Sequence, residues 1–124
     1  MSAVKTFDPA GWDLAYALSL KGTRTISVCI PCRNEAQTVG DLIRIIEPTL
    51  VGTLVDELIV LDDDSTDGTD EIAAEAGATV VPVDFVHFFH GAERGKGNAL
   101  WASLLASAGD IVVWIDGDIT SFTT

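Results

Sequence analysis

Four short apolar runs, spaced along the chain with helical patterns between them, constrain the fold more than any other feature. The runs cover residues 26–30, 58–61, 79–83 and 111–115, and most of their side chains are β-branched or leucine. Each run has the length of a strand. Each is also apolar nearly throughout, which is typical of strands that are covered on both faces. We therefore predict four buried strands.

The segments between these runs have the apolar spacing of helices. They cover residues 38–46, residues 69–76 before Gly77, and residues 98–108 before Gly109. In the first of them, three side chains are expected to face inward: Leu42, Ile45 and Ile46. The order strand, helix, strand, helix, strand, helix, strand predicts an α/β fold, with a mostly parallel sheet flanked by helices on both faces.

Two other segments carry predictions of their own. Asp8 and Pro9 have the pattern of an N-cap and a first helical residue, and the apolar stripe that follows ends at Lys21, so we predict one amphipathic opening helix. Residues 84–97 are predicted to be a long loop. It is rich in aromatic residues, so it either packs over the sheet edge or contributes to function.

Composition limits the class of protein. The 124 residues suffice for one domain, since domains have roughly 100–200 residues, and a hydrophobic content of 48% can form a core. The formal charge of −12 disfavours nucleic acid and anionic membranes as partners, because both attract basic surfaces. The sequence has neither an uncharged stretch of roughly 18 apolar residues nor the pattern of a secretory signal. The expectation is a soluble, cytoplasmic protein.

The two cysteines raise a redox and a zinc hypothesis. Cys29 and Cys32 form a C-x-x-C pair, but Cys29 lies inside an apolar run and Pro31 follows it, whereas a redox pair places its first thiol at a helix N-terminus. His87 and His90 could complete a zinc site, although their separation from the cysteines fits no zinc-finger spacing. We disfavour both hypotheses.

Three common nucleotide and calcium motifs are incomplete. The turn after the first run, residues 31–35, lacks the glycines of a dinucleotide-binding site. Lys96 is followed by Gly97, where a phosphate-binding Walker loop needs serine or threonine. Residues 63–68 copy the start of a calcium loop, but its twelfth position is Ala74 in place of glutamate.

The most informative motif is Asp116-Gly117-Asp118, which follows the last apolar run. Ligands of parallel α/β sheets bind at the carboxyl ends of the strands. Two carboxylates at such an end can bind one divalent cation, and the glycine between them lets a diphosphate approach the backbone. The alternative is an ordinary Asp-Gly turn with a solvated or capping Asp118.

Other polar residues follow the earlier strands. Residues 62–64 are all aspartate, and with Ser65 they can bind a nucleobase or ribose, or cap the next helix. Asn34 and Gln37 have the spacing of a capping pair, whereas Glu35 is available to a ribose or base. Lys96 either faces a phosphate at a helix N-terminus or is a solvated turn lysine.

These segments together resemble the GT-A nucleotide-sugar glycosyltransferases, of the family 2 type. The pattern P-x-x-N-E is present at residues 31–35, D-E-x-I-V-x-D-D-x-S-x-D-x-T at 56–69, G-K-G-x-A-L at 95–100, and G-D-I-V-x-x-x-D-x-D at 109–118. The resemblance spans residues 26–118 in order. Asp64 departs from it, because this position usually holds glycine. Within the family, the sequence is most similar to the glucosyl-3-phosphoglycerate synthase branch. Three features carry this narrower resemblance: Trp12 in the opening segment, the lead-in to the first strand, and Trp101 after G-K-G.

The resemblance implies a GT-A fold and a function. Residues 1–24 would form an N-terminal helix and lead-in, and residues 25–124 a truncated nucleotide-sugar-binding subdomain. The implied activity is that of a hexosyltransferase, which moves glucose from UDP-glucose to 3-phosphoglycerate with retention of configuration, using Mg²⁺ or Mn²⁺. A homodimer of the complete protein is a further expectation.

The resemblance also assigns residues to roles. Lys96 would assist nucleotide binding, Asp116 would contact the ribose or the metal, and Asp118 would ligate the metal. The uridine would be held by Pro31, Cys32, Arg33, Asn34, Glu35 and Ser65. The acceptor site, the remaining metal ligand and the catalytic groups are expected in a following half of the protein, so the catalytic residues stay unknown.

Two alternatives remain open. One is an inverting family 2 enzyme that acts on a polyprenyl phosphate. The other is a nucleotide-binding module without catalytic activity.

Overall fold

The fold is described by a computed structural model, which covers residues 3–6, 8–90 and 96–123, without the side chain of Lys96. The elements, in chain order, are η1 (Pro9–Gly11), α1 (Leu14–Lys21), β1 (Ile26–Cys32), α2 (Val39–Leu50), β2 (Glu57–Asp62), α3 (Thr69–Ala76), β3 (Thr79–Pro82), α4 (Val83–His90), α5 (Lys96–Ala106) and β4 (Ile111–Trp114). The four predicted strands are all present.

The strands form one parallel sheet in the order β3-β2-β1-β4. β1 lies between β2 and β4, with Cys32 paired to Asp62 and Cys29 paired to Trp114. Because all pairs are parallel, the segments that follow β1, β2 and β4 leave the sheet at the same edge. The predicted parallel sheet is therefore confirmed, and it brings the three polar strand ends together.

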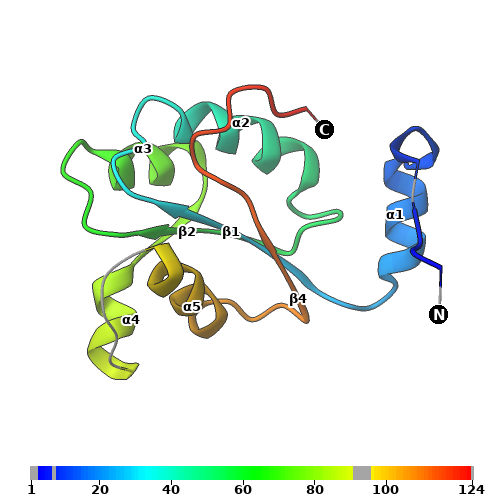
Figure 1. Cartoon of the computed structure of the whole chain (residues 1–124). Helices are drawn as coiled ribbons and strands as arrows, with labels where there is room; N and C mark the ends of the chain where they lie inside the picture. The colour runs from blue at the N-terminus through cyan, green and yellow to red at the C-terminus, as the bar shows by residue number, and fades with distance from the viewer. Residues whose placement is uncertain (1–2, 7, 91–95, 124) are drawn as a thin grey trace.

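Helices cover both faces of the sheet, as predicted (Figure 1). On one face, α2 and α3 pack on Val28, Ile30 and Val60. On the other face, α4 and α5 pack on Ile59 and Leu61. A strand that is covered on both faces must be apolar at successive positions, which explains the unbroken apolar runs in the sequence.

The inward face of α2 differs in one residue from the prediction. Leu42 and Ile46 are buried as expected, and so is Ile43. Ile45 is only half-buried and lines a small hollow with Ile119. The prediction for Ile45 is therefore wrong in part, because this side chain faces the segment after β4 and not the sheet.

The predicted opening helix is divided into two elements. The Asp8 side chain accepts a hydrogen bond within η1, and Asp13 caps α1 separately by accepting from the Tyr16 backbone N–H at 2.7 Å. None of the residues of α1 is buried, so the prediction of one amphipathic helix is wrong. α1 lies off the start of β1, apart from the helices that cover the sheet (Figure 1), and Lys21 forms an ion pair with Asp56 at 2.7 Å. No helix in the described ranges is long and apolar enough to cross a membrane.

The predicted loop at residues 84–97 is wrong over its first half, which forms α4. Val83 and Val86 are buried one helical turn apart and anchor α4 to the sheet. The helix escapes prediction because β-branched and aromatic residues have modest helix propensity. Its three phenylalanines, Phe85, Phe88 and Phe89, are exposed. Residues 91–95 lie outside the described part of the chain.

A polar junction precedes β4. The Ser27 hydroxyl donates to Glu57 Oε1 at 2.6 Å and accepts the Gly109 backbone N–H at 2.8 Å. The Ala108 N–H also donates to Glu57 Oε1, at 2.6 Å. The N–H groups of Ala108 and Gly109 therefore donate to side chains of β1 and β2 and not to carbonyl groups of α5. For this reason α5 ends at Ala106 and not at the predicted residue 108.

Candidate functional site

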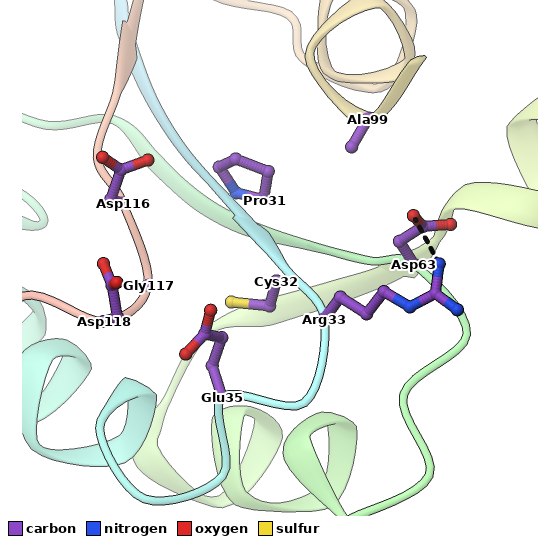
Figure 2. Close-up of a pocket in the computed structure, with 9 residues that line it drawn as sticks. All are labelled: Pro31, Cys32, Arg33, Glu35, Asp63, Ala99, Asp116, Gly117 and Asp118. Carbon is purple, nitrogen blue, oxygen red and sulfur yellow. Dashed lines mark ion pairs between the residues drawn. The ribbon is translucent and has the colours of Figure 1, made fainter. Parts of the chain in front are cut away.

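A pocket of about 240 Å³ lies at the edge of the sheet where β1, β2 and β4 end. Figure 2 shows its lining, which comes from the end of β1 and the residues that follow it, the residues after β2 and β4, and α5. The lining residues are Pro31, Cys32, Arg33, Glu35, Asp63, Ala99, Asp116, Gly117 and Asp118. Six of the nine belong to the set of predicted site residues. Asp63 belongs to the aspartate run predicted to bind base or ribose, and Ala99 was not anticipated.

One side of the pocket is acidic. Asp116 and Asp118 extend from the segment after β4, and the Glu35 carboxylate points toward the same side of the pocket from the turn after β1 (Figure 2). Asp116 and Glu35 both have interactions within the described structure. The negative charge is therefore concentrated at one side of the pocket, as expected for the region that meets a cation.

The carboxylates of this acidic side could hold a magnesium-like ion only if other ligands complete its coordination. Within the described residues, no group of three or more His, Cys, Asp or Glu side chains is placed to hold a metal. Asp116 and Asp118 alone are two hard oxygen ligands. Mg²⁺ is commonly bound by one or two carboxylates together with substrate phosphates and waters. The pocket therefore suits a cation that arrives with, or is completed by, a diphosphate.

The cysteines do not support a redox or zinc site. Both thiols are free and buried. Burial raises the pKa of Cys29 to about 11, and burial together with the Glu35 charge raises that of Cys32 to about 12. A thiol reacts, and binds zinc, as the thiolate, so the raised pKa values disfavour both kinds of site at neutral pH. His87 and His90 lie on α4 beside Trp101.

The other side of the pocket carries an ion pair. The Arg33 guanidinium lies 3.8 Å from Asp63 Oδ2, and the Arg33 side chain is 55% exposed, whereas the Asp63 side chain is 9% exposed (Figure 2). The separation is longer than a hydrogen bond, so the pair contributes at most about 1 kcal/mol. Arg33 and Asp63 therefore offer a ligand both N–H donors and carboxylate acceptors away from the acidic turn.

Asn34 and Ser65 do not line the pocket. They form hydrogen bonds that join the loop after β1 to the loop after β2. The Asn34 backbone N–H donates to Ser65 Oγ at 2.9 Å, and Asn34 Oδ1 accepts the Thr66 N–H at 2.8 Å. Asn34 therefore does not cap α2, whose N-cap is Thr38, and the predicted Asn34–Gln37 capping pair is wrong. The uridine contacts assigned to Asn34 and Ser65 stay predictions.

Two more hydrogen bonds join the same loops. The Glu35 N–H donates to Thr69 Oγ1 at 2.9 Å, and the Ala36 N–H donates to Asp67 Oδ2 at 3.1 Å. Asp67 Oδ1 also accepts the N–H of Thr69, the first residue of α3, at 3.1 Å. The polar residues of this loop pair fix the backbone that carries Arg33 and Glu35.

The departure from the family pattern at Asp64 has a structural explanation. Asp64 has φ of 57°, in the left-handed region that favours glycine. Aspartate tolerates this region better than most side chains, so the turn can form without glycine. Next to it, Asp62 is buried, and desolvation raises the pKa of its carboxyl, although hydrogen bonds from Ser65 lower it in part.

Lys96, which is predicted to assist nucleotide binding, is the first residue of α5. Its side chain lies outside the described part, so its role stays a prediction. Residues 91–95, which precede it, also lie outside the described part of the chain.

Comparisons with known proteins agree with this geometry. The profile of glycosyl transferase family 2 matches residues 27–122. A glucosyl-3-phosphoglycerate synthase from Mycolicibacterium paratuberculosis is 47% identical over 117 residues, which are 94% of this chain and 35% of that protein.

Solved structures are similar as well. The Mycobacterium tuberculosis glucosyl-3-phosphoglycerate synthase in complex with Mn²⁺, UDP-glucose and phosphoglyceric acid has a TM-score of 0.88 at 45% identity, covering 95% of this chain and 42% of that one. The same enzyme with Mg²⁺ and UDP has a TM-score of 0.81 at 48% identity, covering 86% and 38%. The predicted GT-A fold is thereby confirmed.

The chain spans only 35% to 42% of the length of these relatives. The match over most of the chain nevertheless decides its family. The parallel sheet, the acidic turn after β4 and the profile match over residues 27–122 show that this chain belongs to glycosyl transferase family 2.

Proposed function

We propose that this chain carries the donor-binding site of a retaining glucosyltransferase that uses UDP-glucose and 3-phosphoglycerate. The observation that carries the proposal is the placement of Asp116 and Asp118 in the pocket at the strand ends. Relatives that are 45% to 48% identical bind Mn²⁺ or Mg²⁺ with UDP or UDP-glucose. Their names favour this reading over an inverting enzyme that acts on a polyprenyl phosphate.

The two sides of the pocket suggest how a donor would lie. Asp118, with Asp116, would hold Mg²⁺ or Mn²⁺ together with the diphosphate. The bound cation would neutralise charge on the departing UDP. Asp63 and Arg33 lie away from that turn, where a carboxylate can accept an N–H of the base and a guanidinium can donate to its carbonyl oxygens. Glu35 lies where a ribose hydroxyl could meet its carboxylate.

In the reaction, the bond between the glucose anomeric carbon and the diphosphate oxygen breaks. A bond from that carbon to the acceptor hydroxyl oxygen forms, and the hydroxyl proton passes to the departing UDP or to solvent. The chain's own residues in this proposal bind and orient the donor. The groups that bind 3-phosphoglycerate are expected in the part of the relatives that lies beyond the match. The catalytic residues, a homodimer and a cytoplasmic location stay predictions.

Calorimetric titration with UDP tests the metal assignment. Wild type should bind UDP more tightly when Mn²⁺ is present, and Asp118→Ala should weaken that binding by at least about tenfold, since it removes a direct ligand. UDP affinity without metal should change little. Asp41→Ala is a matched control, because it removes an equal charge from a side chain that is 84% exposed on α2 and does not line the pocket. Unchanged Mn²⁺-dependent binding in Asp118→Ala would refute the assignment.

Product analysis tests the reaction. The protein from the complete reading frame, incubated with UDP-glucose and 3-phosphoglycerate, should give an α-linked product by NMR. A β-linked product would indicate the inverting alternative. Metal-dependent UDP binding without transfer or donor hydrolysis would favour a non-catalytic nucleotide-binding module.

A further inference from the structure

Gly117, between the two pocket aspartates, is held by a residue far away in the sequence. The Thr38 hydroxyl donates to the Gly117 carbonyl oxygen at 2.7 Å. Thr38 is the N-cap of α2, yet its side chain makes no capping hydrogen bond to its own helix. Its other acceptor, the Glu35 carbonyl, is more distant, at 3.5 Å. A hydroxyl has one hydrogen, so the short bond to Gly117 takes it.

Gly117 is also held from the side of β1. A side-chain carbon placed on Gly117 would lie 2.7 Å from Cys32 Sγ, closer than real contacts allow. Cys32 is 3% exposed in β1 and hydrogen-bonded into the sheet, so its sulfur has little room to move. The φ of Gly117 is outside the left-handed region. Glycine is therefore required at this position for space, not for its backbone angle.

The Thr38 hydrogen bond and the close approach of the Cys32 sulfur both meet Gly117. Figure 2 shows Asp116 and Asp118 on either side of Gly117, with the Cys32 sulfur directed toward this turn. The Ile115 N–H still donates to the Cys29 carbonyl oxygen of β1, at 3.2 Å, whereas residues 116–118 after it belong to no helix or strand. Two neighbouring carboxylates also repel each other before a cation binds. Contacts that fix the turn in advance reduce the free energy lost when the cation orders it.

We propose that Thr38 and Cys32 are positioning residues, which hold Gly117 so that Asp116 and Asp118 face the pocket in the arrangement that binds the cation. The inference rests on the proposed function, because it assumes that these aspartates hold Mg²⁺ or Mn²⁺. It adds that α2 and β1 set the geometry of the turn, so residues outside the turn control its affinity for the metal.

Thr38 can be tested by two substitutions. Thr38→Val keeps the shape and removes the hydroxyl, whereas Thr38→Ser keeps the hydroxyl. Thr38→Val should weaken Mn²⁺-dependent UDP binding about two- to tenfold, the range of one neutral hydrogen bond, and Thr38→Ser should restore it. Thr49→Val is the matched control, since it removes a hydroxyl bonded to the Ile45 carbonyl at 2.6 Å in the same helix. It should leave binding unchanged.

The measurement is the UDP affinity of the full chain, determined by calorimetry over a series of Mn²⁺ concentrations. Thermal unfolding without metal shows whether each variant is folded. A positioning role predicts that Thr38→Val needs more Mn²⁺ for half-maximal binding while metal-free UDP affinity stays the same. An equal loss with and without Mn²⁺, or no loss, would overturn the role of Thr38. Wild type without Mn²⁺-dependent binding would overturn the proposed function as well.

Cys32 is tested by a double-mutant cycle with Gly117. Gly117→Ala should weaken Mn²⁺-dependent UDP binding about tenfold or more, because the new methyl group displaces the turn. Adding Cys32→Ala removes the sulfur and should recover most of the loss, since residues in contact do not act additively. Circular dichroism confirms that each variant is folded. A double variant that binds as weakly as Gly117→Ala, with both folded, would overturn the role of Cys32.

Discussion

Gly109→Ala perturbs the junction from which β4 leads to the pocket. A side-chain carbon at this position would lie 2.7 Å from the Ser27 backbone nitrogen and 3.1 Å from the Ile111 carbonyl oxygen, and it would also collide with Ser27 Oγ. Two of these atoms are backbone in paired strands, so they cannot move aside as a flexible side chain could. The clash must displace the start of β4.

Three contributions determine how much the free energy of unfolding falls in Gly109→Ala. Gly109 is half-buried but closely packed against β1 and β4, and overpacking of such a position costs about 1–3 kcal/mol. The displaced Gly109 N–H also loses its 2.8 Å hydrogen bond to Ser27, which contributes about 1 kcal/mol. Alanine restricts the unfolded chain and returns about 0.4–1 kcal/mol. Gly109→Ala should therefore lower the free energy of unfolding by about 1–4 kcal/mol.

Urea unfolding followed by circular dichroism measures this loss. Small proteins lose about 1–3 kcal/mol of stability per molar urea, so the midpoint should fall by about 1 M. Gly11→Ala is the control, because nothing lies within 4 Å of the added carbon, and it should change stability by less than about 0.5 kcal/mol. Ser27→Ala should not rescue Gly109→Ala, since the backbone clash remains. A loss below about 0.5 kcal/mol for Gly109→Ala would refute the reasoning.

Three further outcomes follow from the ionisable groups. The pKa values of Cys29 and Cys32 are raised to about 11 and about 12, so both thiols should be alkylated at pH 8 far more slowly in the native chain than in urea. Mass spectrometry measures the two rates, and equal rates would contradict the burial of the thiols. Burial raises the pKa of Asp62 above its ordinary 3.8, so its contribution to stability is present below pH 3.8 and is lost as the pH rises through the folded value. Asp62→Asn should therefore gain stability relative to wild type between about pH 3 and pH 7 in urea titrations, and a pH-independent difference would count against this. The hydrogen bond from Lys21 lowers the pKa of Asp56, whose stabilising contribution is present above pH 3.8 and lost as the pH falls through the folded value. Lys21→Met should raise the Asp56 pKa in an NMR titration, and an unchanged value would exclude the pair.

Much of the fold was predictable because its signals are local. The strands are apolar at successive positions because helices cover both faces of the sheet, and this pattern is visible in the sequence. Gly77 ends α3 as predicted, with φ of 113° that favours glycine. α4 was missed because only Val83 and Val86 anchor it, and packing on the sheet outweighs the modest helix propensity of its aromatic residues.

The sequence by itself determined the order of the four strands and of α2, α3 and α5 between them, and it placed the polar residues at strand ends. Both follow from hydrophobic periodicity and turn chemistry, which act over a few neighbouring residues. It therefore also indicated that Asp116, Asp118 and Glu35 could meet in one site. Parallel strands share a carboxyl edge, so this much needed no knowledge of side-chain contacts.

Only the tertiary structure decided which polar residues face the pocket and which hold its walls. Asn34 and Ser65 bond across two loops, 31 residues apart in the sequence, and Thr38 bonds Gly117 across 79 residues. No local pattern encodes such contacts, because a hydroxyl or amide of a given spacing can serve a ligand, a helix end or another loop equally well. The choice is made by packing, which brings the partners to within hydrogen-bond distance only when the whole sheet has formed.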